Sequence, residues 1–237
     1  MRNRWLIALA AIGLHISIGS VYAWSVLTRP IMVDMGFTLS QTTWTFSLAI
    51  LMLGLSAGFL GSFAEKIGPK KSGLLAMLFW VAGLFGTAYA LSIHNLTLLY
   101  LFYGIIGGIG LGIGYITPVS TLVKYFPNRP GFATGLAIMG FGFASLIAGH
   151  LMQYLVAHVD FIILGITYLI VMSASSLYLK APTPKEPTRS NQDKSTMYVH
   201  NHGMLANDAM KTWQFSALWW VFFVNITCGI GPLSLAS

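Results

Sequence analysis

The sequence predicts an all-α membrane protein. Hydrophobic residues make up 56% of its 237 residues and charged residues only 8%, with a mean hydropathy of +0.73. Soluble domains carry about a quarter of their residues as charged side chains. The apolar stretches reach the roughly 20 residues that a helix needs to cross a bilayer, and they lack the alternation of barrel strands. Helices are therefore expected, because backbone polar groups in lipid must be bonded internally.

Seven spans are expected, with a polar stretch between the sixth and the seventh. The expected spans are Trp5–Leu27, Thr43–Phe63, Ser72–Leu91, Leu98–Leu122, Phe132–Val156, Phe161–Leu179 and Trp213–Leu235. The polar stretch contains KAPTPKEPTRSNQDKS, a composition typical of a flexible linker. This pattern predicts a six-helix bundle over residues 1–179, a cytoplasmic linker over 180–212, and the first helix of a truncated second half over 213–237.

The distribution of positive charge predicts the topology. If the N-terminus is cytoplasmic, 12 of the 13 basic residues fall on the cytoplasmic side and only Arg29 falls outside. The cytoplasmic residues are Arg2, Arg4, Lys66, Lys70, Lys71, Lys124, Arg129, Lys180, Lys185, Arg189, Lys194 and Lys211. Cytoplasmic loops of membrane proteins carry such an excess. We therefore expect a multi-pass protein of the inner (plasma) membrane, and the net charge of +7 indicates topology rather than nucleic-acid binding.

None of the seven expected spans contains Asp, Glu, Lys or Arg. Intramembrane charges usually mark ion pathways, voltage sensors or counter-ions, so this chain is expected to hold no fixed cation for an anionic substrate. The spans also lack paired carboxylates and His-x-x-x-His metal pairs, and span seven lacks the lysine that retinal needs. No catalytic site, metal or cofactor is expected, and the chain is not expected to be an enzyme.

The break between spans two and three is short and charged. It reads GSFAEKIGPKK over residues 61–71. We expect Gly61 to end one helix, Gly68 and Pro69 to make the turn, and Lys70 and Lys71 to anchor the next helix on the cytoplasmic side.

This segment resembles the signature loop of the major facilitator superfamily, Gly-x-x-x-Asp-Arg-x-Gly-Arg-Lys/Arg. The spacing is kept, but Glu65 replaces Asp, Lys66 replaces Arg, and Pro69 occupies the first basic position. The resemblance implies two six-helix halves with inverted repeats, and a loop that packs against the other half and helps to hold one access state. The residues of this expected latch are Gly61, Glu65, Lys66, Gly68, Lys70 and Lys71. A plain solvated turn is the alternative.

Span four is rich in glycine, in the order GIIGGIGLGIGYITP. The spacing differs from the Gly-x-Gly-x-x-Gly of a nucleotide loop, which would also follow a strand. Small residues four apart let membrane helices approach closely. The glycines expected to pack helices together are Gly104, Gly108, Gly112, Gly110 and Gly114.

Further motifs resemble the oxalate/formate antiporter family of that superfamily. They are VYAWSV at 21–26, the Gly114-Tyr115 pair, KYFPNRPG at 124–131, ATG at 133–135 and FFVNITCG at 222–229, with Pro130 departing from the small or basic residue expected there. The resemblance implies a secondary transporter of small carboxylates such as oxalate, formate, lactate or pyruvate. In the family the cations that hold the anion lie in the second half. We therefore expect a half-molecule whose partners are a carboxylate, the lipid bilayer and the missing C-terminal half.

A carboxylate needs hydrogen-bond donors and aromatic walls near the midplane. Tyr22 is expected to face the cavity, whereas Trp24, about 200° away around the helix at 100° per residue, faces a neighbouring helix or the outer interface. Tyr115 is the second expected donor. His15 is expected either as a neutral histidine bonded within the bundle or as a proton-linked group. Asn225 is expected either to line the cavity or to join two helices.

Two other functions compete with transport. A non-transporting fragment that needs a partner chain is one, because the chain holds only six spans and a seventh. A seven-helix receptor-like protein is the other, although such a receptor places its N-terminus outside the cell.

Overall fold

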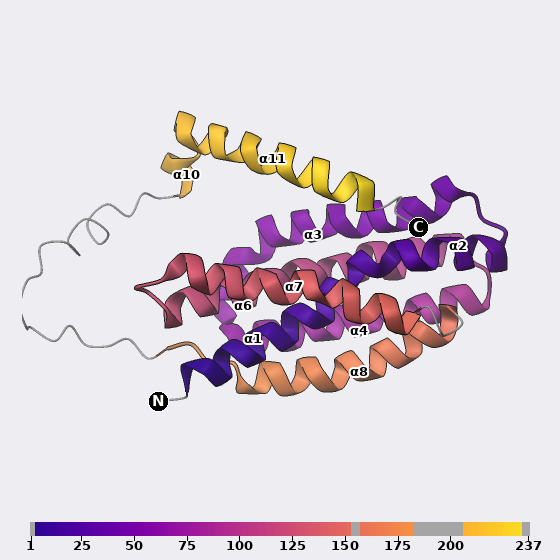
Figure 1. The fold of residues 1–237 in the computed structure, drawn as a ribbon, viewed down its shortest axis with the longest axis horizontal. Coiled ribbons are helices and arrows are strands. Elements are labelled where there is room, and N and C mark those ends of the chain that lie inside the picture. Colours follow the sequence, from indigo (N-terminus) through magenta and orange to yellow (C-terminus); the bar gives the residue numbers. More distant parts are fainter. Residues whose placement is uncertain (1–2, 153–156, 183–205, 234–237) are drawn as a thin grey trace, which may run out of the picture. The chain divides into compact units, whose positions relative to one another are not determined.

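The computed structural model describes residues 3–152, 157–182 and 206–233, and every regular element in these ranges is a helix (Figure 1). The chain divides into two compact units, one from Met1 to Pro182 and one from Thr183 to Leu235. Six helical segments of the first unit are long and apolar enough to cross a membrane. The fold is thus the all-α bundle that the composition predicts.

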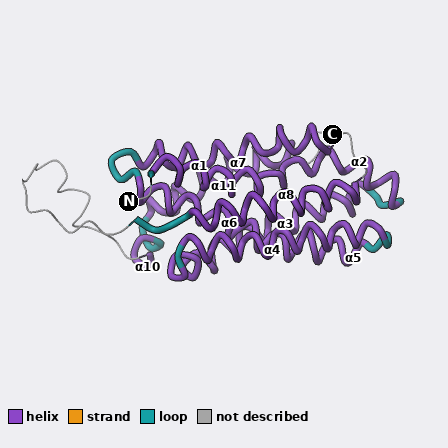
Figure 2. The backbone as a smooth tube through the Cα atoms, turned by 90° about the horizontal axis from the view of Figure 1, so that it is seen from below, coloured by secondary structure: helices purple, strands orange, loops and turns teal. Residues whose placement is uncertain are grey.

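The six segments run back and forth along one long axis (Figures 1 and 2). The first consists of α1 (Arg4–Gly19), a 3-10 turn η1 (Ser20–Ala23) and α2 (Trp24–Met35). Then come α3 (Leu39–Ile67) and α4 (Pro69–Ser92). The fourth consists of α5 (Leu96–Leu99), a π-helical stretch η2 (Tyr100–Gly107) and α6 (Gly108–Tyr125). The last two are α7 (Pro130–Met152) and α8 (Ala157–Tyr178).

Local sequence signals set several helix ends. Asn3 caps α1 by accepting a hydrogen bond from the backbone N–H of Trp5 at 3.0 Å. Thr38 and Gln41 form a capping box at the start of α3, satisfying N–H groups that a helix start leaves free. Gly68 follows α3 at a φ of +82°, a conformation that favours glycine, and Pro69 opens α4.

The core lies where α4 packs between α6 and α8, while α3 covers α6 and α1 packs on α7. Two tryptophans fill its centre: Trp24 and Trp80 are each 1% exposed. The Trp80 indole Nε1–H donates to the backbone oxygen of Ser17 at 3.1 Å and thereby joins α4 to α1. A buried indole N–H usually needs such a partner.

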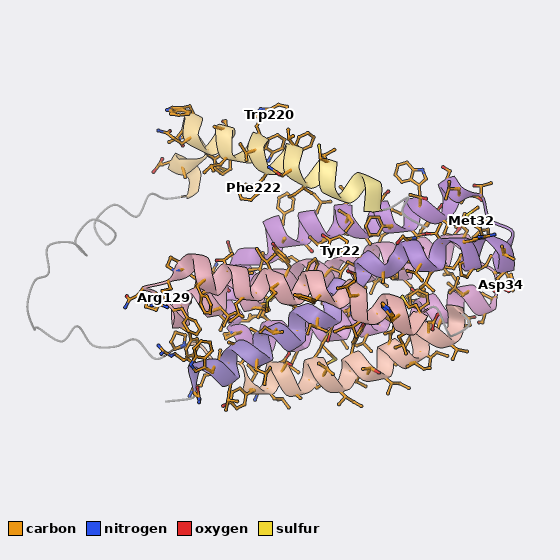
Figure 3. The ribbon with its side chains drawn as sticks, in the orientation of Figure 1. Tyr22, Met32, Asp34, Arg129, Trp220 and Phe222 are labelled. Carbon is orange, nitrogen blue, oxygen red and sulfur yellow. The ribbon has the colours of Figure 1, made fainter. Side chains whose placement is uncertain are left out.

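Basic residues gather at one end of the bundle. They lie at the starts of α1, α4 and α7, at the ends of α3 and α6, and just after α8. Because consecutive helices run in opposite directions, these six positions share one end. Figure 3 shows Arg129 at this end, Asp34 at the other and Tyr22 between them. In the first unit, among the described residues, only Arg29 carries a basic group at the opposite end.

Three details differ from the sequence prediction. The first segment continues to Met35 through Pro30, so it ends eight residues later than expected. The helix α3 runs on past Gly61 to Ile67, so Gly61 does not end it and the turn is made by Gly68 alone. The sixth helix begins at Ala157, so Asp160 lies inside a membrane segment, contrary to the expectation of uncharged spans. Hydropathy identifies the apolar middle of a helix, whereas caps and packing determine its ends.

The second unit is described over residues 206–233. It contains a short turn of helix, α10 (Ala206–Ala209), and α11 (Trp213–Leu233), which covers the seventh expected span. Within α11 the rings of Trp219 and Phe223 stack 5.2 Å apart. Residues 183–205 of the expected linker lie outside the described residues.

Candidate functional site

Tyr22 lies at a break in the first membrane segment. The helix α1 stops at Gly19 and resumes at Trp24 after the 3-10 turn. At Gly19 the chain approaches α7 so closely that an added Cβ would overlap the backbone oxygen of Phe141 and lie 2.8 Å from the Cβ of Ala144. Glycine is therefore required where α1 meets α7. The turn that follows leaves Tyr22 partly exposed, with its ring centroid 5.2 Å from that of Phe141.

Tyr115, on α6, reaches the same place from another helix. Its ring centroid lies 5.5 Å from Phe141, and its side chain is partly exposed like that of Tyr22. The hydroxyls of Tyr100 and Tyr125 donate to backbone oxygens. In contrast, no described residue forms a hydrogen bond with the hydroxyl of Tyr22 or Tyr115. Both are therefore free to donate to an anion.

The ring of His15 packs against that of Tyr115 and is fully buried. Its Nδ1 is 2.6 Å from the backbone oxygen of Ala137 on α7, and its Nε2 is 3.1 Å from the backbone oxygen of Tyr115 on α6. The ring also stacks on that of Tyr115, with centroids 5.6 Å apart and an interplanar angle of 29°. His15 thus ties α1 to both α6 and α7.

Phe141 is the residue that sequence reasoning missed. Its ring makes edge contacts with His15, Tyr22 and Tyr115, with centroids 5.2 to 5.7 Å apart. We call these four residues the aromatic centre. The residues expected from the sequence are hydrogen-bond donors, whereas Phe141 is the apolar ring that contacts them. In the structure Ala137, Phe141, Ala144 and Ala148 are buried positions of α7 at helical spacing, but the sequence alone does not distinguish Phe141 from other phenylalanines.

Trp24 lies away from the aromatic centre, as its helical angle predicts. It is 1% exposed, and its ring lies 4.4 Å from Tyr103 on η2 and 6.3 Å from Phe161 on α8. The expectation that it faces a neighbouring helix is confirmed. Its indole Nε1 has no hydrogen-bond partner among the described residues, and neither carboxylate oxygen of the buried Asp160 has one.

Asn225 belongs to the second unit and is described there by itself. It is exposed on α11, and its Nδ2 donates to the backbone oxygen of Val221 in the same helix at 3.0 Å.

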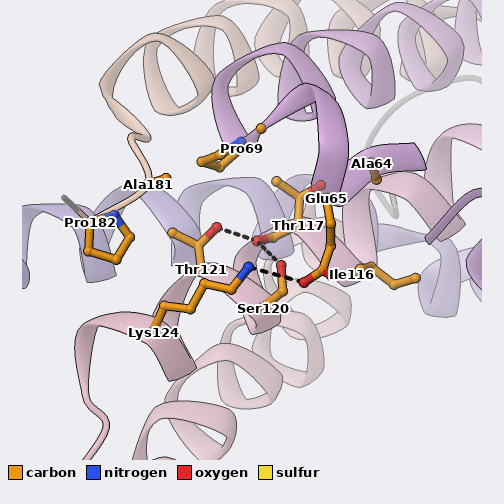
Figure 4. Close-up of a pocket in the computed structure, with 11 residues that line it drawn as sticks. Ala64, Glu65, Pro69, Ile116, Thr117, Ser120, Thr121, Lys124, Ala181 and Pro182 are labelled. Carbon is orange, nitrogen blue, oxygen red and sulfur yellow. Dashed lines mark hydrogen bonds and ion pairs between the residues drawn. The ribbon is translucent and has the colours of Figure 1, made fainter. Parts of the chain in front are cut away.

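A second polar cluster occupies the basic end of the bundle. Glu65, near the end of α3, forms an ion pair with Lys124 of α6 at 3.1 Å, and both side chains are about half exposed, at 50% and 53%. The pair borders a pocket of about 60 Å³, which is also lined by Thr117, Ser120 and Thr121 (Figure 4). Of the expected latch residues, Glu65 and Gly68 line this pocket.

The glycines of span four lie on two faces. Added Cβ atoms at Gly104, Gly108 and Gly112 would meet Leu48, Met52 and Ser56 of α3. Those at Gly110 and Gly114 would meet Trp80 of α4 and Ile18 of α1. Each face lets α6 approach its neighbours at distances that side chains would prevent. Within the described ranges, no group of three His, Cys, Asp or Glu residues could hold a metal ion.

Comparison with known proteins decides the family. A model of the major facilitator superfamily matches residues 7–236. The chain belongs to this superfamily. It is 29% identical to an uncharacterized MFS-type transporter, YhjX, of Escherichia coli K12 over 80% of this chain and 48% of that protein. It is 26% identical to an oxalate:formate antiporter of Oxalobacter formigenes over 93% of this chain and 52% of that protein.

A third similarity is to a pyruvate carrier. The chain is 22% identical to apicoplast pyruvate carrier 1 of Toxoplasma gondii over 79% of this chain and 44% of that protein. The chain therefore spans about half the length of these curated relatives. It is a multi-pass membrane protein of a transporter family, and the receptor-like alternative is thereby set aside.

Proposed function

We propose that this chain forms the N-terminal half of a secondary transporter for small carboxylates, working by alternating access. The observation that carries the proposal is the aromatic centre. Two partly exposed tyrosines from different helices present unpaired hydroxyls around one phenylalanine ring, midway along the bundle. Such an arrangement suits a carboxylate, which accepts hydrogen bonds at its oxygens while apolar walls exclude water.

The relatives support the carboxylate as substrate. The antiporter is named for oxalate and formate and the carrier for pyruvate, and all three anions carry a carboxylate. We propose that the second half of the transporter completes the site, in the way that halves of this superfamily meet around a central substrate. In this proposal the chain transports only when that half is present, and by itself it is the non-transporting half-molecule.

The basic end fits the same proposal. Apart from Arg29, the bundle places its described lysines and arginines together, which is the arrangement of a cytoplasmic face. We propose that the N-terminus is cytoplasmic in the inner (plasma) membrane and that Glu65, Lys66, Lys70 and Lys71 contact the second half when the cytoplasmic side is closed. The Glu65–Lys124 pair is half exposed, so its charges are accessible to a partner.

An uptake panel tests the proposal. The complete reading frame that contains this chain is expressed in cells, and uptake of labelled oxalate, formate, lactate and pyruvate is compared with that of glycerol. We expect uptake of at least one carboxylate above vector-only cells and no added uptake of glycerol. Absence of carboxylate uptake, with the protein present in the membrane, would contradict the proposal.

A further inference from the structure

Both ring nitrogens of His15 face hydrogen-bond acceptors. Nδ1 lies 2.6 Å from the Ala137 oxygen and Nε2 lies 3.1 Å from the Tyr115 oxygen. A backbone oxygen only accepts hydrogen bonds, and a neutral imidazole has one N–H to donate. In the neutral form, one nitrogen would therefore turn a lone pair toward a carbonyl oxygen. Only the imidazolium, with two N–H groups, donates to both.

We propose that His15 is a proton-binding site whose two facing backbone oxygens fit the imidazolium form. The added proton binds the ring nitrogen that carries no hydrogen in the neutral form. The longer contact, from Nε2 to Tyr115, is the bond that proton release would remove, because the shorter contact to Ala137 is kept by one N–H. Protonation thus adds a hydrogen bond between α1 and α6 within the bundle.

The surroundings are suited to a buried cation. The His15 ring is fully buried, stacks on the face of the Tyr115 ring at 5.6 Å and meets the edge of Phe141 at 5.7 Å. Aromatic faces attract cations, most strongly where water is excluded. A cation without such partners would be costly at this depth. The backbone oxygens of Ala137 and Tyr115 and the ring of Tyr115 would stabilise the cation without an acidic side chain.

Other titratable groups lie on the elements that pack against α1. Among the described residues, Tyr115 is the titratable side chain whose ring contacts that of His15. Tyr22 is joined to it through Phe141. The other described titratable side chains on α1, α4, η2, α6, α7 and α8 are Arg4, Lys70, Lys71, Tyr89, Tyr103, Lys124, Tyr125, His150, Asp160, Tyr168 and Tyr178, with Arg129 just before α7. No described acidic side chain forms an ion pair with His15, so the carbonyl oxygens are its hydrogen-bonding partners.

The proton has a consequence for the substrate, and this step rests on the proposed function. The described membrane segments of the first unit place their charged side chains near their ends, including Asp160 in the first turn of α8. A protonated His15 supplies positive charge beside the rings of Tyr115 and Phe141, and the ring of Tyr22 contacts the same Phe141. Opposite charges in a low-dielectric site favour each other. Proton and carboxylate should therefore bind together.

Nitrogen NMR on a single-histidine chain tests the proton site without any transport measurement. The full 237-residue chain is labelled with ¹⁵N-histidine in lipid nanodiscs, with five of its six histidines replaced. His94 becomes Asn, because its φ of +53° is left-handed, and the other four become Gln. The pH is then lowered from about 8 to about 5, the range in which histidine takes up its proton.

We expect both ring nitrogens of His15 to carry hydrogen at the acidic end, with separate shifts that differ from those of free histidine. A ring that keeps one bare nitrogen throughout the titration would overturn the proposal. The control keeps His150 in place of His15. His150 is exposed and its Nδ1 contacts one backbone oxygen, that of Leu146 in its own helix at 2.9 Å. Its nitrogen shifts should not show the two distinct hydrogen bonds that are expected for His15.

Uptake then tests the coupling to carboxylate separately. In the complete reading frame, we expect wild-type carboxylate uptake to rise as the external pH falls and His15→Gln to flatten that profile. An unchanged profile in His15→Gln would overturn the coupling while leaving the proposed transport intact. A protein that moves no carboxylate but whose His15 takes up the second proton would contradict only the proposed function.

Discussion

The aromatic centre and the basic end differ in how far their polar side chains are buried. At the centre, His15 is fully buried and both of its nitrogens meet backbone oxygens of other helices. At the basic end, Glu65 and Lys124 are about half exposed and pair with each other. A buried polar group that loses its partner costs far more than an exposed ion pair that breaks. The aromatic centre therefore depends on close packing, whereas the ion pair at the basic end can break and re-form at low cost.

The largest expected effect comes from the helix contact beside the centre. Gly19→Ala places a methyl group against the Phe141 backbone and Ala144. Backbone cannot yield as a flexible side chain does, so we expect a loss of stability of about 1–3 kcal/mol. The midpoint of thermal unfolding in detergent measures it.

Gly58→Ala in α3 is the matched control. An added Cβ there meets nothing within 4 Å. Alanine favours a helix over glycine by up to about 1 kcal/mol, so this variant should be unchanged or more stable. Equal losses in both variants would show that the contact between α1 and α7 is not the cause.

The next largest change in stability is expected at Asp160, a buried acidic residue outside the aromatic centre. Its carboxylate is 1% exposed and has no partner among the described residues. Asp160→Asn removes the ionised form and keeps the shape. We expect the variant to be more stable by roughly 1 kcal/mol, because an unpaired charge is costly to bury. A clear loss of stability would show that the carboxylate has a partner in the folded protein.

The smallest stability effect should come from the basic end. Lys124→Ala breaks the pair with Glu65, and exposed pairs contribute about 0–1 kcal/mol. We expect a change within that range that fades as salt is raised. A loss of stability as large as that of Gly19→Ala would mean that contacts at the basic end contribute as much as those at the aromatic centre.

The sequence predicts the helical bundle well, and the reasons lie in particular residues. Long uncharged runs locate the six segments, and the angle between Tyr22 and Trp24 correctly separates the two rings. Helix ends are harder to predict, because Pro30 and Gly61 lie inside helices that packing against other helices stabilises. A bundle can keep a proline or a glycine inside a helix where an isolated helix would stop.

The site was only half visible in the sequence. Tyr22, Tyr115 and His15 stand out as polar or aromatic side chains in apolar runs. Phe141 does not, because one more phenylalanine in a membrane helix carries no signal until its neighbours are known. The partners of His15 are backbone oxygens of residues 100 and 122 positions away. Only the fold brings them together.

Uptake by tyrosine variants tests the central claim most directly. Tyr22→Phe and Tyr115→Phe are compared with wild type for carboxylate uptake, and Tyr89→Phe, which is 57% exposed near the far end of α4, is the control. A hydrogen bond to a charged group contributes about 1.5–3 kcal/mol, so each central variant should lose roughly tenfold or more in apparent affinity. Membrane levels and the control should be unchanged. Normal uptake in both central variants would contradict a carboxylate site at the aromatic centre.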